Sequence, residues 1–305
     1  MTFSGAAWPF FVAPFFLSRY ISPRMSDRND TSRVTLRFEG IRGTVAASGI
    51  HTMRYGGNTA CVFLRCGPHT VILDAGTGIV PLGWRMAAMG TPIDADIILS
   101  HFHMDHTCGM PFFAPLFNPE NRFRIWGFGH PEGETTRSIL SNHFCPPYEP
   151  FTPADFLSHP EFHDFHPHDT FELHPGLMVH TLPLNHPNGA CGFRIEYAGR
   201  KICYLSDTEH TPGAPDARII NFCKDADIFI YDAMFTDAEF PNFIGWGHST
   251  WQEACRLAQA CGAKRTALFH LRPARDDDEN DLIDRLAGEA APGTIVAREG
   301  LEIEL

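Results

Sequence analysis

The stretch IILSHFHMDHTCG, residues 97–109, runs from an apolar, strand-like segment directly into a group of metal-binding residue types. Alternate side chains of an extended chain lie on one face, so His101 and His103 can bind the same ion. Asp105 and His106 come just past the strand and can turn towards a second ion. A polar surface turn is the alternative, but the functional sites of α/β proteins gather at strand ends. The spacing therefore predicts a dinuclear metal site at the end of this strand.

The composition of the chain limits the classes of protein to which it can belong. Its 305 residues are 44% apolar and 20% charged, which excludes wholesale disorder and allows one large domain or two small ones. The 36 acidic residues outnumber the 24 Lys and Arg residues, and the formal charge is −12. This balance disfavours unspecific binding to nucleic acid, which needs clustered cations. The 17 histidines raise the question of a metal without answering it.

Short apolar runs alternate with helical stretches from Val34 onward. This mixture predicts one α/β domain, residues 34–305, with layered sheets and outer helices. Helices are expected at Gly78–Met89 with a Thr77 cap, at Trp251–Cys261 with a Ser249 or Thr250 cap, and at Asp278–Ala290. Strands are expected at Val34–Phe38, Cys61–Arg65, Thr70–Asp74, Asp96–Ser100, Lys201–Ser206, Asp227–Tyr231 and Thr266–His270.

Two segments differ from this pattern. Residues 1–33 form an N-terminal extension that is apolar and aromatic over residues 1–24. Its apolar run is shorter than the roughly 20 residues of a membrane span, so we expect a disordered tail or a misassigned start, with a signal or an anchor as the alternative. Residues 115–180 are rich in Pro, His and acidic residues, which indicates a loop-rich cap. Nine cysteines without a C-x-x-C pair indicate free thiols and a cytoplasmic protein.

The segment HFHMDH resembles the H-x-H-x-D-H signature of the metallo-β-lactamase superfamily. Other landmarks of that superfamily stand in the right order: ILDAGTG at 72–78, LNHPNGACGFRIE at 184–196, YLSDTEH at 204–210 and LFHLRP at 268–273. The resemblance covers essentially Val34–Leu305. It implies an α/β fold built as the four-layer αββα sandwich of the metallo-β-lactamase type.

The resemblance also implies a set of metal ligands. His101, His103 and His186 would hold one metal, Asp105, His106 and His270 the other, and Asp207 would bridge the two. Two divalent metal ions are therefore expected. Zinc is the first candidate, and manganese and iron are the alternatives. Asp74 would orient a ligand histidine from beneath the metals, and His210 lies close to the site in sequence. An aspartate at Asp207, where lactamases often carry cysteine, is typical of phosphodiester and thioester hydrolases.

Two further segments narrow the resemblance to a branch of phosphodiesterases. FEGIRGTVAASGIHTMRYGGNTACV, residues 38–62, is similar to the opening of phosphoribosyl 1,2-cyclic phosphodiesterase-like and cyclic-nucleotide phosphodiesterase-like proteins. It departs from their usual pattern because Thr44 and Ala46 replace a serine and a proline. Arg42 could bind a substrate phosphate, with Asn58 beside it, but a structural turn explains the segment equally well.

The second segment, GWGHST at 245–250, resembles the H-S-T loop of tRNase Z-type phosphodiesterases. It implies that His248 hydrogen-bonds the scissile phosphate or protonates the leaving alcohol. Asp232 lies in a segment that resembles the same branch of phosphodiesterases, and it is expected either to maintain the fold or to support His248. The expected mechanism is attack on phosphorus by a metal-bridged hydroxide, with Asp105 steering the proton of the nucleophile.

A small, cyclic phosphodiester is the expected substrate, and no membrane partner is expected. A tRNA nuclease is disfavoured because residues 110–180 contain three arginines, no lysine and nine acidic residues. A thioester hydrolase of the glyoxalase II kind uses the same ligands and is the alternative function. A non-catalytic metal-binding protein is the alternative from another class. A homodimer stays open.

Overall fold

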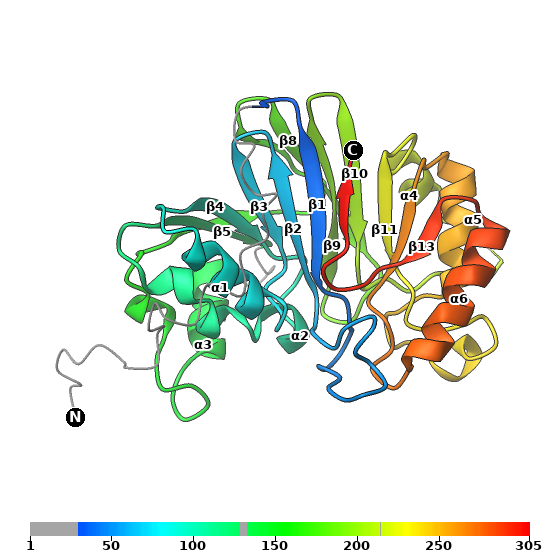
Figure 1. Ribbon diagram of the computed structural model, residues 1–305, viewed down its shortest axis with the longest axis horizontal. Coiled ribbons are helices and arrows are strands. Elements are labelled where there is room, and N and C mark those ends of the chain that lie inside the picture. Colours follow the sequence, from blue (N-terminus) through cyan, green and yellow to red (C-terminus); the bar gives the residue numbers. More distant parts are fainter. Residues whose placement is uncertain (1–29, 129–132, 214) are drawn as a thin grey trace.

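The computed structural model describes residues 30–128, 133–213 and 215–305, which form two seven-stranded sheets packed face to face (Figure 1). Helices α1 and α3 lie on the outer side of one sheet, and α5 and α6 lie on the outer side of the other. This arrangement confirms the four-layer αββα sandwich. Residues 1–29, most of the expected N-terminal extension, lie outside the described residues. We propose that residues 34–305 form one domain.

The first sheet has the strand order β14-β1-β2-β3-β4-β5-β6. Its strands β3 to β6 run parallel, so their carboxyl ends share one edge of the sheet. The bounds are β1 (Val34–Gly40), β2 (Cys61–Cys66), β3 (His69–Leu73), β4 (Asp94–Ile98), β5 (Arg122–Phe128), β6 (Glu161–Phe165) and β14 (Glu302–Glu304).

The second sheet has the order β13-β12-β11-β10-β9-β8-β7. Its strands β10 to β13 run parallel, whereas β7 to β10 form an antiparallel meander. The bounds are β7 (Thr170–His174), β8 (Leu177–Leu184), β9 (Ala190–Tyr197), β10 (Arg200–Leu205), β11 (Ile228–Asp232), β12 (Thr266–Phe269) and β13 (Thr294–Val296).

The helices cover the apolar outer faces of the two sheets. One core cluster fills the space between the sheets and continues to α5 and α6, and a second lies between the first sheet, α1 and α3. No helix of the described ranges is long and apolar enough to cross a membrane. The helices are α1 (Ile79–Ala88), α2 (Met104–Thr107), α3 (Thr136–His143), α4 (Ala217–Phe222), α5 (Trp251–Cys261) and α6 (Asp277–Ala290), with 3-10 turns η2 (Met110–Phe112), η3 (Ala114–Phe117), η4 (Pro153–Asp155) and η5 (Phe240–Asn242).

The expected strands and helices are present, and their bounds shift by at most a few residues. The cap of α5 is confirmed, because Thr250 Oγ1 accepts from the Glu253 N–H at 3.0 Å. The prediction that Thr77 caps α1 is wrong, because no side chain of the described residues caps this helix. Thr77 Oγ1 instead accepts from the Thr59 N–H at 2.9 Å, which ties the start of α1 to the end of a neighbouring loop. Residues 115–180 contain β5, β6 and β7. Because β6 and β7 are edge strands of the two sheets, this segment is part of both sheets, whereas the predicted loop-rich cap contained no strands.

Candidate metal centre

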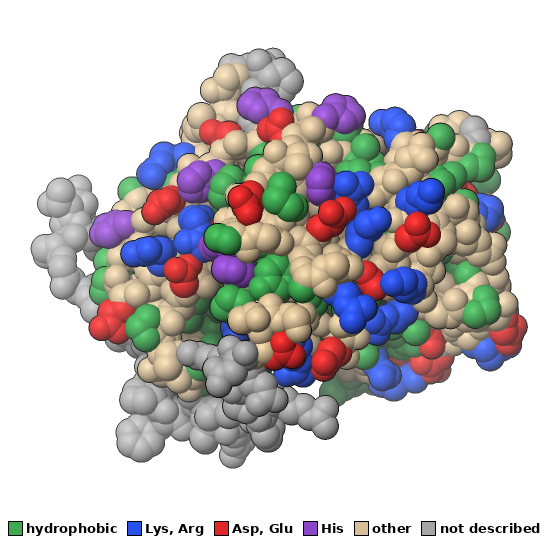
Figure 2. Space-filling view, turned by 90° about the horizontal axis from the view of Figure 1, so that it is seen from above, with side chains coloured by type: hydrophobic (Ala, Val, Ile, Leu, Met, Phe, Trp, Pro, Cys, Tyr) green, Lys and Arg blue, Asp and Glu red, His purple; other side chains and the backbone are tan. Residues whose placement is uncertain are grey.

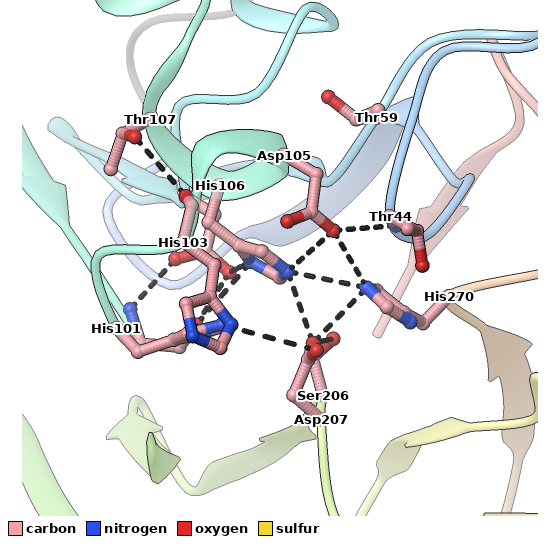
Figure 3. Close-up of polar contacts among 12 residues, drawn as sticks. Thr44, Thr59, His101, His103, Asp105, His106, Thr107, Ser206, Asp207 and His270 are labelled. Carbon is pink, nitrogen blue, oxygen red and sulfur yellow. Dashed lines mark hydrogen bonds and ion pairs between the residues drawn. The ribbon is translucent and has the colours of Figure 1, made fainter. Parts of the chain in front are cut away.

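Seven side chains that the sequence marks as metal ligands converge at one end of the sandwich. Figure 3 labels all of them except His186. They come from five places in the chain: the loop after β4, α2, and the residues that follow β8, β10 and β12. These side chains form two groups, and a third group joins Asp207 and His270 to Asp232 and His248; the candidate ligand atoms within each group lie within 4.8 Å of one another. The first two groups are His101, His103 and His186, and Asp105, His106, Asp207 and His270.

In the three-histidine group, the ring nitrogens point towards a common centre. His186 Nδ1 lies 2.8 Å from the carbonyl of Gly247, to which it donates, so Nε2 carries the lone pair. That Nε2 lies 3.0 Å from His103 Nδ1. His101 Nε2 is buried without a hydrogen-bond partner. Because a buried ring nitrogen without a partner is costly, these three nitrogens fit a divalent cation.

The second group combines imidazoles with carboxylates. His106 Nε2 lies 3.2 Å from His270 Nε2, and Asp207 Oδ2 lies 3.0 and 3.2 Å from these two nitrogens. Asp105 Oδ2 lies 3.1 Å from His270 Nε2. Burial lowers the pKa of His106, but the charges of Asp207 and Asp105 outweigh it and raise that pKa well above its usual value. The carboxylates thus favour a positive charge here, which a proton or a divalent cation supplies.

Asp207 lies between the two groups, as Figure 3 shows. Its Oδ1 atom is 3.9 Å from His101 Nε2 and 3.6 Å from His186 Nε2, whereas Oδ2 faces His106. Burial raises the pKa of Asp207, but the charges of His270 and His106 outweigh it and hold that pKa well below its usual range. An ionised carboxylate in this position suits the bridging role, which remains a prediction.

Asp74 lies beneath the second group and supports His106. The completely buried carboxylate of Asp74 accepts from Ser100 N at 2.7 Å and from Tyr204 OH at 2.6 Å. His106 Nδ1 lies 2.8 Å from Asp74 Oδ2, so Nε2 is turned towards the cluster. The geometry is the one expected for a residue that orients a ligand histidine.

Two glycines leave room for the rings of ligand histidines. A Cβ on Gly43 would lie 2.2 Å from Cε1 of His270, and one on Gly247 would lie 2.3 Å from Nδ1 of His186. Both distances are far below van der Waals contact. Gly43 of GIRG and Gly247 of GWGH are therefore structural requirements of the site.

We expect Gly43→Ala to weaken metal binding by about 10- to 100-fold, because the added methyl displaces the His270 ring. Competition with a chromogenic chelator measures the affinity. Gly288→Ala is the matched control: an added Cβ there meets nothing nearer than 3.6 Å, so metal affinity should not change. Unchanged affinity in Gly43→Ala would contradict the proposed ligand role of His270.

His248 lies beside the second group, at the start of the loop that caps α5. Its Nδ1 is 2.8 Å from Asp232 Oδ2, to which it donates, and 3.7 Å from Asp207 Oδ1. Burial lowers the pKa of His248, but the charges of Asp232 and Asp207 outweigh it and raise that pKa to about 9. Asp232 Oδ2 also lies 3.6 Å from Nδ1 of His270. Asp232 therefore hydrogen-bonds His248 and also lies near His270, whose Nδ1 has no hydrogen-bond partner among the described residues.

His210 and Thr44 lie around the cluster. His210 Nδ1 contacts Ser249 Oγ at 2.8 Å, and its ring stacks on Phe240, so its contacts are with the loop before α5. The Thr44 N–H donates to Asp105 Oδ2 at 2.7 Å, and Thr44 has a φ of 64°. Sequence reasoning missed this backbone contact, because nothing in the residue type of Thr44 indicates it.

Arg42 and Asn58, expected to bind substrate, hold loops together instead. The guanidinium of Arg42 is completely buried and donates to the carbonyls of Gly56 at 2.9 Å and Arg275 at 2.7 Å. Asn58 Nδ2 donates to Glu299 Oε2 at 2.9 Å. Arg42 Nε and Nη1 are used internally, and Nη2 is buried without a hydrogen-bond partner in the part of the chain that the structure describes. Because Arg42 has no exposed surface, the structure favours the structural turn over a phosphate site.

The fold and the ligand cluster define a hydrolase of the metallo-β-lactamase fold. Residues 69–271 match the model of the "Beta-lactamase superfamily domain", so the chain belongs to this superfamily. Membership implies divalent metals, and the imidazole and carboxylate groups described above fit them.

Ribonuclease Z of Gemmatimonas aurantiaca is 36% identical over 107 residues, which make up 35% of this chain and 32% of that protein. The chain thus matches about a third of the length of such curated relatives. Among solved structures, the metallo-β-lactamase fold protein YhfI from Bacillus subtilis has a TM-score of 0.69 at 18% identity, covering 90% of this chain and 99% of that one. A diphosphatase from the PhnP family has a TM-score of 0.64 at 21% identity, covering 90% and 97%. These structures are alike in fold.

Proposed function

We propose that the chain is a metal-dependent phosphodiesterase that acts on a small phosphodiester. The observation that carries this proposal is the position of His248, which Asp232 holds at 2.8 Å beside the carboxylate of Asp207. A histidine held in this way can donate a proton to an oxygen that leaves phosphorus. A thioester hydrolase has less need of such a donor, because a thiolate departs without one.

Two divalent ions would supply Lewis-acid catalysis and a nucleophile at neutral pH when bound. His101, His103 and His186 would hold one ion, and Asp105, His106 and His270 the other, with Asp207 between them. Asp105 accepts the proton of the nucleophile, and the Thr44 N–H fixes the orientation of its carboxylate. His248 protonates the leaving oxygen, and Asp232 keeps its Nδ1 bound so that the other ring nitrogen is free for this step.

The positions of the lysines support a small substrate. All three lysines precede or begin strands whose carboxyl ends lead to the metal centre, so they lie at the far end of the sandwich. Figure 2 looks onto that end and shows Lys, Arg and His side chains there, interspersed with Asp and Glu. A polymer bound at the metals would need such cations near the metals themselves. The lysines are Lys201, Lys224 and Lys264.

A tRNA-processing nuclease is the second candidate, favoured by the local similarity to ribonuclease Z. Purified protein with its metals counted separates the candidates when it is offered four substrates: bis-(p-nitrophenyl) phosphate, a 2′,3′-cyclic nucleotide, a thioester and a precursor tRNA. We expect two divalent ions per chain and turnover of the first two substrates only. Faster thioester turnover would identify a glyoxalase II-like enzyme, tRNA cleavage a nuclease, and two metals without any turnover a binding protein.

A further inference from the structure

Large apolar side chains are exposed on the loops that surround the metal centre. Met104 stands between the ligands His103 and Asp105 in the first turn of α2, and its side chain is 63% exposed. Val45, 58% exposed, follows Thr44, whose N–H donates to Asp105. A single exposed apolar side chain is ordinary, but apolar side chains that surround a site with convergent polar groups are typical of a ligand-binding surface.

A third loop contributes an aromatic side chain on another side of the centre. Trp246, 60% exposed, precedes Gly247, whose carbonyl lies 2.8 Å from Nδ1 of His186. The indole packs edge-on against Phe243 with 5.2 Å between the ring centres, which holds it in place. The two loops that touch metal ligands through their backbones, and helix α2, which carries two of the ligands, therefore each present an apolar side chain to solvent. We call Val45, Met104 and Trp246 the apolar rim.

Cations on the neighbouring segments are engaged in internal pairs. Arg272 and Arg275, which follow the ligand His270, both bind the carboxylate of Glu239. The guanidinium of Arg54, on the loop after Val45, binds acidic residues at the start of α6. Negative charge on a substrate would thus be met by the metals, and the rest of the substrate would meet apolar surface.

We propose that the substrate carries an apolar ester arm, aromatic or alkyl, that packs on the apolar rim while its phosphoryl group binds at the metals. This inference rests on the proposed phosphodiesterase function and narrows its substrate class. The arm loses contact with water on Met104, Val45 and Trp246, which contributes binding energy in proportion to the apolar area covered.

Calorimetric binding of phosphonates to the metal-loaded protein tests the proposal, whichever ester arm leaves in the reaction. Methyl, phenyl and octyl phosphonate share a head group and differ only in the arm. We expect the phenyl or the octyl compound to bind at least about tenfold more tightly than the methyl compound. A tighter phenyl compound indicates an aromatic arm such as a base, and a tighter octyl compound indicates an alkyl chain.

Trp246→Ala should reduce this preference severalfold, whereas Trp84→Ala, an equal truncation on α1, should leave it unchanged. Equal affinity for the three phosphonates would overturn the proposal, as would a preference that Trp246→Ala leaves intact. Sedimentation is measured on the same samples, because a dimer that Trp246→Ala dissociates, with equal phosphonate affinities, would make the rim an interface between copies. Turnover of bis-(p-nitrophenyl) phosphate, measured in parallel, shows separately whether the proposed function itself holds.

Discussion

Replacement of Asp207 by alanine is expected to lower turnover of bis-(p-nitrophenyl) phosphate by about a thousandfold and to release metal from the protein. Its carboxylate lies 3.0 Å from His106 Nε2 and 3.6 Å from His186 Nε2, so it contacts both groups of candidate ligands. Without this charge, two dications would repel each other across the cluster. Elemental analysis of the metal content, together with kcat/KM, measures both effects.

Asp94→Ala provides the matched control. Asp94 lies at the start of β4, at the end of the strand away from the metal centre, and its carboxylate forms an exposed pair with Arg124. Such a pair contributes little to stability, so metal content and turnover should stay unchanged. Full activity in a metal-poor Asp207→Ala protein would refute the two-metal scheme, and so would full metal content in that variant.

Replacement of His248 by glutamine is expected to lower turnover of a 2′,3′-cyclic nucleotide by about a hundredfold or more. The expected loss with bis-(p-nitrophenyl) phosphate is below about tenfold, because p-nitrophenolate departs without a proton whereas an alkoxide does not. Metal content should remain, because the proposed two-metal site does not use His248; a loss of metal would instead assign His248 to the third group of possible ligands, which it forms with Asp207, Asp232 and His270. The ratio of the two turnover numbers is the measurement that distinguishes proton donation from damage to the site.

Asp232→Asn should also lower turnover of the cyclic nucleotide more than turnover of bis-(p-nitrophenyl) phosphate, because the Asp232 carboxylate accepts a hydrogen bond from His248 Nδ1 at 2.8 Å. His166→Gln is the control, since its side chain is exposed on the loop between β6 and β7 and its ring faces Asp169. Equal losses with both substrates in His248→Gln would show that His248 supports the structure and is no proton donor.

The local features of this protein were predictable where short sequence segments carry the information. The strands and the helix Trp251–Cys261 follow from apolar periodicity and from Thr250 and Gly262, which act within one turn of the chain. Thr77 misled the prediction because its hydroxyl has a better partner in Thr59, which lies 18 residues away. A cap residue competes with tertiary contacts that no window of sequence contains.

Four of the candidate ligands, His101, His103, Asp105 and His106, were predicted from the spacing of H-x-H-x-D-H after a strand, which is a local pattern. The other three, His186, Asp207 and His270, were implied only by the resemblance to the metallo-β-lactamase superfamily. What surrounds the ligands was decided by tertiary structure. Arg42 looked suited to phosphate, but it donates to the carbonyl of Arg275, which lies 233 residues away. The need for Gly43, the hydrogen bond of Asp232 to His248 and the apolar rim likewise arise only where separate segments meet, because residue type shows what a side chain can do and packing decides what it touches.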